Sequence, residues 1–524
     1  MPGVGSDDCR GLDGVIGSTA VVVASTGPAP APGVRDVRIG IVGAGFGGIA
    51  AAIRLRQHGI SDFVVFERAD TLGGTWRDNT YPGCACDVES HLYSLSFAPW
   101  PHWTRKFAGQ AEIWSYLRHT ADAFGVSPHI RYGHDVTGAR WDDTDARWTV
   151  ETNAGTYHAA VLVLALGPLS EPVLPDLPGL NAFPGPAFHS ARWRHDVDLH
   201  GRRVAVVGTG ASAAQFIPRI QPLVERLHVF QRTPPWVVPR RDIAIPAWRR
   251  AVYRRVPAIQ RAVRAARDVQ HELIGLPFRY PRLAPPFEAV ARRHLAAAVS
   301  DPALRRMLTP AYRMGCKRVL IADDYYPALS QTNVDVIAAA VTAIDGRAVV
   351  GADGTRRDVD VVIFGTGFRP TDPLLASSIG GRGGVTLAER WQGSPKAYMG
   401  TTVSGFPNLF ILIGPNTGLG HSSEVLMIEA QIEHMLGVLA VLARSGSASA
   451  EPSEAAEAAF VREMDRRLQG TVWNTGGCRS WYLDRTGRNS TIWPGGTWSF
   501  RRRLARVIAA DYRLARHDRR MAAG

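Results

Sequence analysis

A glycine-rich turn between an apolar run and a helical pattern is the first feature of this sequence that could do chemistry. Residues 37–42 read VRIGIV, and residues 43–48 follow as GAGFGG before a helical stretch. In the pattern G-x-G-x-x-G, Gly43 allows a sharp turn, Gly45 lets a pyrophosphate approach the backbone, and Gly48 lets helix and strand pack closely. The N-terminus of the helix then presents N–H groups to the phosphates. The pattern predicts a dinucleotide site.

The acid expected of such a site follows the next apolar run. Residues 63–66 read FVVF and end at Glu67, which lies 19 residues after Gly48, where a carboxylate accepts hydrogen bonds from ribose hydroxyls. Residues 72–76 read LGGTW, an extension that resembles the FAD site of flavoproteins with two dinucleotides. Its glycine pair lets the backbone approach the flavin. The residues expected at FAD in this extension are Gly74, Thr75 and Trp76.

A second copy of the pattern lies between residues 201 and 228. Residues 203–207 read RVAVV and residues 208–213 read GTGASA, with alanine in place of the third glycine. The next apolar run ends in QRT rather than in an acid. An acid there would repel a 2′-phosphate, whereas an arginine favours NADP over NAD. The candidate residues of this NADPH site are Gly208, Gly210, Ser212, Arg232 and Thr233.

Two dinucleotide sites in one chain predict an α/β fold with two Rossmann-like domains, one for FAD and one for NADP. Electrons would then pass from nicotinamide to flavin. Apolar runs at 160–166 and 359–364 each end in a glycine turn, so we expect the NADP domain to be inserted into the FAD domain. The expected divisions are a flexible tail at 1–35, FAD-binding domain at 36–165, NADP-binding domain at 166–385 with a helical insert at about 243–310, and the second part of the FAD domain with the C-terminal segment at 386–524.

A motif between the two sites carries a family resemblance. Residues 183–193 read FPGPAFHSARW, which resembles F-x-G-x-x-x-H-x-x-x-W, the fingerprint of type I Baeyer–Villiger monooxygenases. The sequence is also similar to this family at 81–90 and at 314–326, and the resemblance runs from about residue 37 to 500. In the family, the fingerprint lies by the linker between the domains and couples their rotation to turnover. The fingerprint residues are Phe183, Gly185, His189 and Trp193.

The resemblance implies a reaction and a catalytic pair. NADPH reduces FAD, O₂ forms a C4a-peroxyflavin, and the peroxide attacks a ketone to give an ester or lactone and water. A deprotonated peroxide needs a fixed positive charge, and arginine is suitable because it does not lose its proton. By the resemblance, Arg318 supplies this charge and Asp87 is its carboxylate partner. The structural alternative for Asp87 is a helix N-cap.

Two further roles are implied by the same resemblance. Lys317 joins Arg232 and Thr233 at the 2′-phosphate, and Trp481 contacts NADP and lines the substrate cavity. The implied partners are therefore FAD, NADPH, O₂ and a small ketone. The segment after Tyr482 departs from the best-known members, which carry an asparagine-rich turn there.

Three other functions stay open on the sequence. A flavin-containing monooxygenase that oxygenates sulfur or nitrogen is the alternative, against which Trp193 argues. A pyridine-nucleotide disulfide reductase would use Cys84 and Cys86, but their C-x-C spacing differs from the usual C-x-x-C or C-x-x-x-x-C. A non-enzymatic adaptor for membranes or nucleic acids would use the arginine-rich composition, but two intact nucleotide sites argue against it.

Composition excludes several classes. The chain has 524 residues, 45% of them hydrophobic, which excludes wholesale disorder. Five cysteines rule out a disulfide scaffold and indicate a reducing, cytoplasmic location. No apolar run reaches the roughly 18 residues of a membrane span. Net charge is +13, and only three of the 60 basic residues are lysine. The arginine-rich helices near 243–309 predict a solvated face, or weak contact with a membrane surface, whereas no motif supports nucleic-acid binding.

Overall fold

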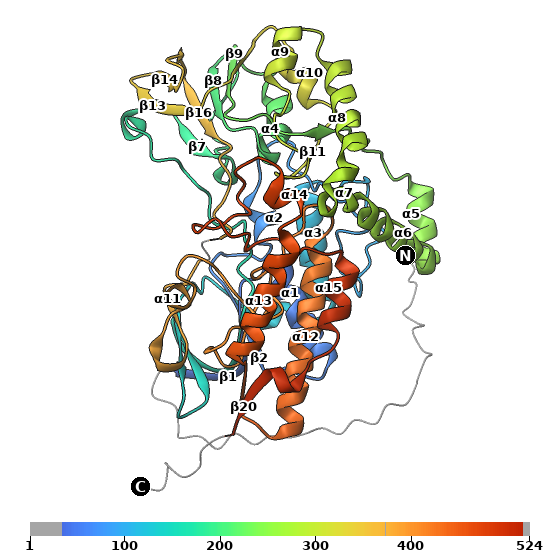
Figure 1. The fold of residues 1–524 in the computed structure, drawn as a ribbon, viewed down its shortest axis with the longest axis vertical. Helices are drawn as coiled ribbons and strands as arrows, with labels where there is room; N and C mark the ends of the chain where they lie inside the picture. Colours follow the sequence, from blue (N-terminus) through green and yellow to red (C-terminus); the bar gives the residue numbers. More distant parts are fainter. Residues whose placement is uncertain (1–33, 372–373, 517–524) are drawn as a thin grey trace, which may run out of the picture.

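The chain forms two lobes, each built around a parallel sheet (Figure 1). The structure, a computed structural model, describes residues 34–371 and 374–516. Most of the expected flexible tail, residues 1–33, lies outside the described residues. The first strand starts three residues before the position expected from its β-branched run.

The first lobe contains an eight-stranded sheet. Its order is β17-β4-β5-β6-β1-β2-β3, and β18 also pairs with β6. Strands β1, β2, β3, β6 and β18 run parallel to one another, whereas β5 runs antiparallel to both β4 and β6. The bounds are β1 Val34–Val42, β2 Phe63–Glu67, β3 Ile130–Tyr132, β4 Val136–Asp142, β5 Arg147–Thr152, β6 Gly155–Leu164, β17 Ile379–Gly380 and β18 Leu409–Ile411.

Helices from both ends of the chain cover this sheet. The helix of the glycine motif, α1, packs against α12, which in turn packs against α15. The central helix α12 is long and apolar enough to cross a membrane, but 78% of its most apolar stretch is buried in the protein. It is thus a core helix, which inspection of the sequence missed because Glu429 and Glu433 interrupt it. The bounds are α1 Phe46–Gln57, α2 Thr75–Asp78, α3 Gln110–Ala123, α11 Leu387–Trp391, α12 Glu424–Ser445, α13 Glu454–Leu468, α14 Val472–Thr475 and α15 Thr497–Leu504. Two short strands, β19 Ser449–Pro452 and β20 Tyr512–Ala515, pair near the C-terminus.

The second lobe contains a five-stranded parallel sheet in the order β12-β9-β8-β16-β7. Helix α4 follows the second glycine motif. A three-stranded antiparallel sheet, β13-β14-β15, lies beside the five-stranded sheet (Figure 1). The bounds are β7 Ala187–His189, β8 Arg203–Val207, α4 Ala211–Ile220, β9 Arg226–Phe230, β12 Val334–Ile337, β13 Val341–Asp345, β14 Ala348–Gly351, β15 Arg356–Asp358 and β16 Val361–Phe364. Two βαβ units in two sheets give the α/β fold that the sequence predicts.

A helical insert projects from the side of the second lobe (Figure 1). Pro257 begins its longest helix instead of breaking one, because proline is tolerated in the first turn. Arg264 is not on a solvated face as expected: its Nη1 donates hydrogen bonds to three backbone carbonyls of the segment 91–94. The bounds are β10 Val237–Val238, α5 Ala247–Arg255, α6 Pro257–Ile274, α7 Leu276–Arg279, α8 Ala284–Ala298, α9 Pro302–Met307, β11 Leu320–Ile321 and α10 Tyr325–Leu329.

Candidate active site

A cavity of about 870 Å³ lies where residues of both lobes meet. The turns that follow β6, β8 and β16 all reach it, as expected at the carboxyl ends of parallel strands. The structure brings most of the predicted site residues together in its wall. Those that line it are Thr75, Trp76, Asp87, Gly208, Gly210, Ser212, Arg232, Thr233, Lys317, Arg318 and Trp481.

The glycines of the first motif lie outside this wall, in two loops that touch each other. A Cβ on Gly74 would lie 3.2 Å from the Cα of Gly45, and the Gly73 N–H donates to the Ala44 carbonyl at 2.9 Å. A Cβ on Gly48 would lie 1.8 Å from the carbonyl oxygen of Gly43, which itself has a φ of +103°. Only glycine permits this packing. The absence of side chains at these positions lets the two loops lie in contact, and the binding of a phosphate chain there stays a prediction.

Glu67 is held by the protein itself. Its Oε2 accepts from the Ala44 N–H at 2.9 Å, and its Oε1 accepts from the Ala69 N–H at 3.0 Å and from Arg77 at 2.8 Å. These bonds tie the glycine turn to the end of β2. The contact of Glu67 with ribose stays a prediction. Arg77 was missed by the sequence analysis, although it directly follows the LGGTW segment.

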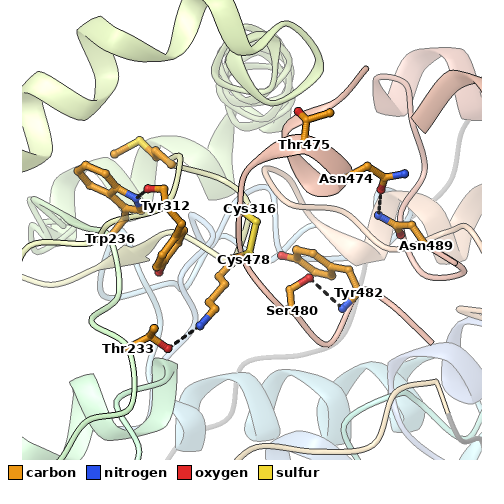
Figure 2. The surroundings of a disulfide bond; sticks show 12 residues. Thr233, Trp236, Tyr312, Cys316, Asn474, Thr475, Cys478, Ser480, Tyr482 and Asn489 are labelled. Atoms are coloured by element: carbon orange, nitrogen blue, oxygen red, sulfur yellow. Dashed lines mark hydrogen bonds between the residues drawn. A yellow bond between two sulfur atoms is a disulfide. The ribbon is translucent and has the colours of Figure 1, made fainter. Parts of the chain in front are cut away.

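Three groups form the candidate 2′-phosphate site. The Lys317 ammonium donates to Oγ1 of Thr233 at 2.7 Å and lies 5.2 Å from the centre of the Tyr312 ring (Figure 2). Burial lowers the pKa of Lys317, and the neighbouring charge of Arg232 lowers it further. Both cations line the same cavity, so the arrangement suits an anion such as a phosphate dianion.

Arg318 and Asp87 form a bidentate ion pair in the wall of the cavity. Nε and Nη2 of Arg318 donate to the two carboxylate oxygens of Asp87, both at 2.8 Å. The charge of Asp87 raises the pKa of Arg318, so this cation stays protonated. No helix begins directly after Asp87 in the described structure, which excludes the N-cap alternative. The pair joins residues 231 positions apart in the chain.

A second carboxyl group in this wall was not foreseen. Glu424 is the first residue of α12, and its Oε1 accepts from the Leu419 N–H at 2.7 Å. Its Oε2 is buried without a hydrogen-bond partner among the described residues. Burial raises its pKa to about 7, although the positive charge of Arg318 acts in the other direction. An acid in the first turn of a helix is ordinary in a sequence, so no signal marked it.

Two of the fingerprint residues, His189 and Trp193, lie in and directly after β7, the edge strand of the five-stranded sheet. Nδ1 of His189 accepts from the Ala191 N–H at 3.0 Å, and burial lowers the pKa of this histidine to about 4. Trp193 packs against the rings of Phe188 and Phe216. These contacts describe packing, and coupling of the domains by Phe183, Gly185, His189 and Trp193 stays a prediction.

The four cysteines in the described part of the chain divide into two free thiols and one disulfide. Cys84 and Cys86 are not bonded to each other, and burial raises the pKa of Cys84 to about 11. Neither is therefore a reactive thiolate, which argues against the disulfide-reductase alternative. Cys316 and Cys478 instead form a disulfide across 162 residues (Figure 2). No pattern in the sequence predicted this bond, since neither cysteine has a partner at a recognisable spacing.

Comparisons with known proteins agree with this geometry. Residues 40–248 match the model of the pyridine nucleotide-disulphide oxidoreductase family. A Baeyer–Villiger monooxygenase of Streptomyces coelicolor is 52% identical over 484 residues, which cover 92% of this chain and 93% of the relative. The chain belongs to the Baeyer–Villiger monooxygenase family. A Baeyer–Villiger monooxygenase of Pseudomonas aeruginosa is 44% identical and covers 94% of this chain and 93% of its own.

A solved structure supports the same family. The structure of cyclohexanone monooxygenase from Rhodococcus sp. Phi1 bound to NADP⁺ has a TM-score of 0.81 and 29% identity, and it covers 92% of this chain and 99% of its own. FAD and NADPH are therefore the cofactors of the present chain, as its sequence predicted. The residues present suit both groups, because glycine occupies both strand-to-helix turns and because Lys317, Arg232 and Thr233 lie together in the cavity wall.

Proposed function

We propose that this enzyme converts a small ketone into an ester or lactone, and that Arg318 and Asp87 form its catalytic pair. The balanced reaction is ketone + O₂ + NADPH + H⁺ → ester + NADP⁺ + H₂O. Bound FAD supplies the redox chemistry, since it takes two electrons from NADPH and delivers them to O₂. The observation that carries the proposal is a doubly hydrogen-bonded guanidinium in the wall of the shared cavity.

Arg318 provides positive charge where negative charge develops on oxygen. A guanidinium keeps its proton throughout the pH range of activity, so it stabilises an oxygen anion without donating a proton to it. Asp87 fixes the plane of the guanidinium through two charge-assisted hydrogen bonds. Fixing the cation before the reaction avoids the cost of reorganising it during the reaction.

The cofactor NADPH is held by a neighbouring part of the cavity wall. Lys317, Arg232 and Thr233 bind its 2′-phosphate, and the turn at Gly208 and Gly210 with Ser212 binds its pyrophosphate. Trp481, which is 43% exposed, contributes an aromatic face to the same wall. The pocket thereby distinguishes NADPH from NADH by charge.

The experiment is a comparison of Arg318→Ala with the parent enzyme on ketones and on sulfides. We expect ester formation to fall by about 10²- to 10³-fold, as for the loss of one group that stabilises an oxyanion. Flavin content and NADPH oxidation should persist. Arg293→Ala, which removes an exposed arginine of α8, is the matched control. Unchanged ester formation, or a parent enzyme that oxygenates only sulfides, would contradict the proposal.

A further inference from the structure

The Cys316–Cys478 disulfide lies between two segments that the proposed function uses. Cys316 is buried in an apolar cluster with Trp236 and Tyr312, two residues before Arg318. Cys478 is half-buried and lies three residues before Trp481. Figure 2 shows the bond joining the segment before Arg318 to the loop that carries Tyr482. The bond therefore connects the catalytic arginine segment to the proposed NADP contact.

Residues 477–481, which we name the strap, have few other attachments. Gly476 accepts from the Arg313 N–H at 2.9 Å before the strap, and Asp484 accepts from Ser394 at 2.7 Å after it. Between these anchors, no hydrogen bond or ion pair links the strap to a described residue outside the loop 476–489, and its bonds are local. The strap is therefore held at its end by Tyr482, which is buried in the apolar cluster of Cys316, and in its middle by the disulfide.

The strap lies at the cavity and is also partly exposed to solvent. Its residues Arg479, Ser480 and Trp481 line the cavity, and both neighbours of Cys478 are exposed. Cys478 is half-buried, whereas Cys316 is 1% exposed, so we expect a small dithiol to attack the bond at Cys478. Attack on Cys478 followed by the second thiol of the reagent releases both cysteines as thiols.

We propose that the Cys316–Cys478 disulfide is a redox-controlled tether that holds the strap, and with it Trp481, against the NADP site. Reduction follows RS–SR + a dithiol → 2 RSH + a cyclic disulfide. Hydrogen peroxide restores the bond by 2 RSH + H₂O₂ → RS–SR + 2 H₂O. The inference rests on the proposed function in one respect, the position of NADP beside Trp481 and Lys317.

The tether acts by lowering the entropy of the strap before the nucleotide binds. A strap that is already ordered costs less to immobilise on binding, so the oxidised enzyme binds NADP⁺ more tightly than the reduced enzyme. Immobilising two or three side chains of this size corresponds to a change of about 10-fold in affinity. Cys316 and Cys478 are positioning residues, since neither touches the reacting atoms.

The test uses the full-length holoenzyme in three states: oxidised, reduced with dithiothreitol, and reoxidised with hydrogen peroxide. A thiol titration shows that two thiols appear and disappear, and equilibrium dialysis measures the Kd of NADP⁺. We expect reduction to raise this Kd by about 10-fold and reoxidation to reverse it. Trypsin cleavage after Arg479 should rise on reduction and fall when NADP⁺ is added, a readout that a purely stabilising disulfide would not move.

Variants separate this bond from other thiol effects. Cys478→Ser should bind NADP⁺ like the reduced enzyme and should not respond to dithiothreitol, whereas Cys9→Ser, the matched control, should respond like the parent. If Cys478→Ser does not fold, the reversible comparison on the parent enzyme decides alone. Equal Kd values with two thiols released would overturn the tether.

Failure of the tether and failure of the proposed function give different results. The binding and cleavage measurements require no ketone, so a redox-dependent Kd supports the tether even if no ester is ever formed. Ester formation with a Kd that ignores the redox state would support the proposed function and overturn the tether.

Discussion

Replacing Asp87 with asparagine should slow ester formation while FAD stays bound. Asp87 accepts two charge-assisted hydrogen bonds from Arg318, each 2.8 Å long. Asparagine offers one oxygen, and its amide N–H₂ would face the second guanidinium nitrogen, donor against donor. The guanidinium then loses its counter-charge and its fixed plane, so we expect the Arg318 side chain to leave the orientation that stabilises an oxygen anion.

The size of the effect follows from the exposure of the pair. A hydrogen bond to a charged group contributes about 1.5 to 3 kcal/mol. The Arg318 and Asp87 side chains are 30% and 25% exposed, so solvent screens part of their interaction. We therefore take the lower part of the range, about 1.5 to 2 kcal/mol, which corresponds to a loss of about 10- to 30-fold in rate.

The assay is the initial rate of ester formation with saturating NADPH and O₂, beside the flavin content of each preparation. Asp345→Asn is the control, because it breaks an ion pair with Arg356 that is exposed on both sides and lies outside the cavity. Exposed pairs contribute little, so this variant should keep its activity. An unchanged ester rate in Asp87→Asn, with FAD fully bound, would refute the role assigned to the pair.

Three further outcomes are expected. Lys317→Ala should raise the KM for NADPH by about 10-fold and leave the KM for NADH unchanged, because it removes one charged contact with the 2′-phosphate; steady-state kinetics with both nucleotides measures this. Glu67→Gln should lose FAD during purification, because it weakens the bond from the Ala44 N–H that shapes the glycine turn; the flavin-to-protein absorbance ratio measures it. Glu424→Gln should gain stability over the parent as the pH rises. The pKa of Glu424 is raised from 4.5 to about 7, so the unfolded parent loses this proton at a lower pH than the folded parent, and its free energy of unfolding falls over that range. The difference between the two proteins should grow between pH 4.5 and 7 and reach about 3 kcal/mol; urea unfolding at several pH values measures it.

Each of these outcomes has a contrary result. Equal increases in KM for NADPH and NADH would show that Lys317 acts on a part common to both nucleotides. Full retention of FAD in Glu67→Gln would show that the turn keeps its shape without that carboxylate. Parallel pH profiles for Glu424→Gln and the parent would show that Glu424 is already ionised at low pH in the folded protein.

Short sequence patterns predicted the features that depend on the backbone of consecutive residues. Each glycine motif occupies the turn between a strand and a helix, because a pyrophosphate-sized gap needs consecutive residues in a set conformation. No such pattern marks side chains that are far apart in the sequence and meet only in the folded protein. The Arg318–Asp87 pair was predicted through a family resemblance, since no spacing connects residues 231 positions apart. Glu424 and the Cys316–Cys478 bond had neither a pattern nor a resemblance behind them, and only the folded chain shows them.

The order of the strands along the chain has a consequence for synthesis on the ribosome. All strands of the five-stranded sheet lie between residues 187 and 364, so that sheet can close while the C-terminal third is still unmade. The eight-stranded sheet must wait for β18, and helix α1 must wait for α12. In the nascent chain the sheet is therefore incomplete until residue 411 has emerged, and the apolar face of α1 stays uncovered until about residue 445 has emerged. A chain that stops early should therefore still fold its NADP lobe, whereas the lobe for FAD should be left exposed to proteolysis and aggregation.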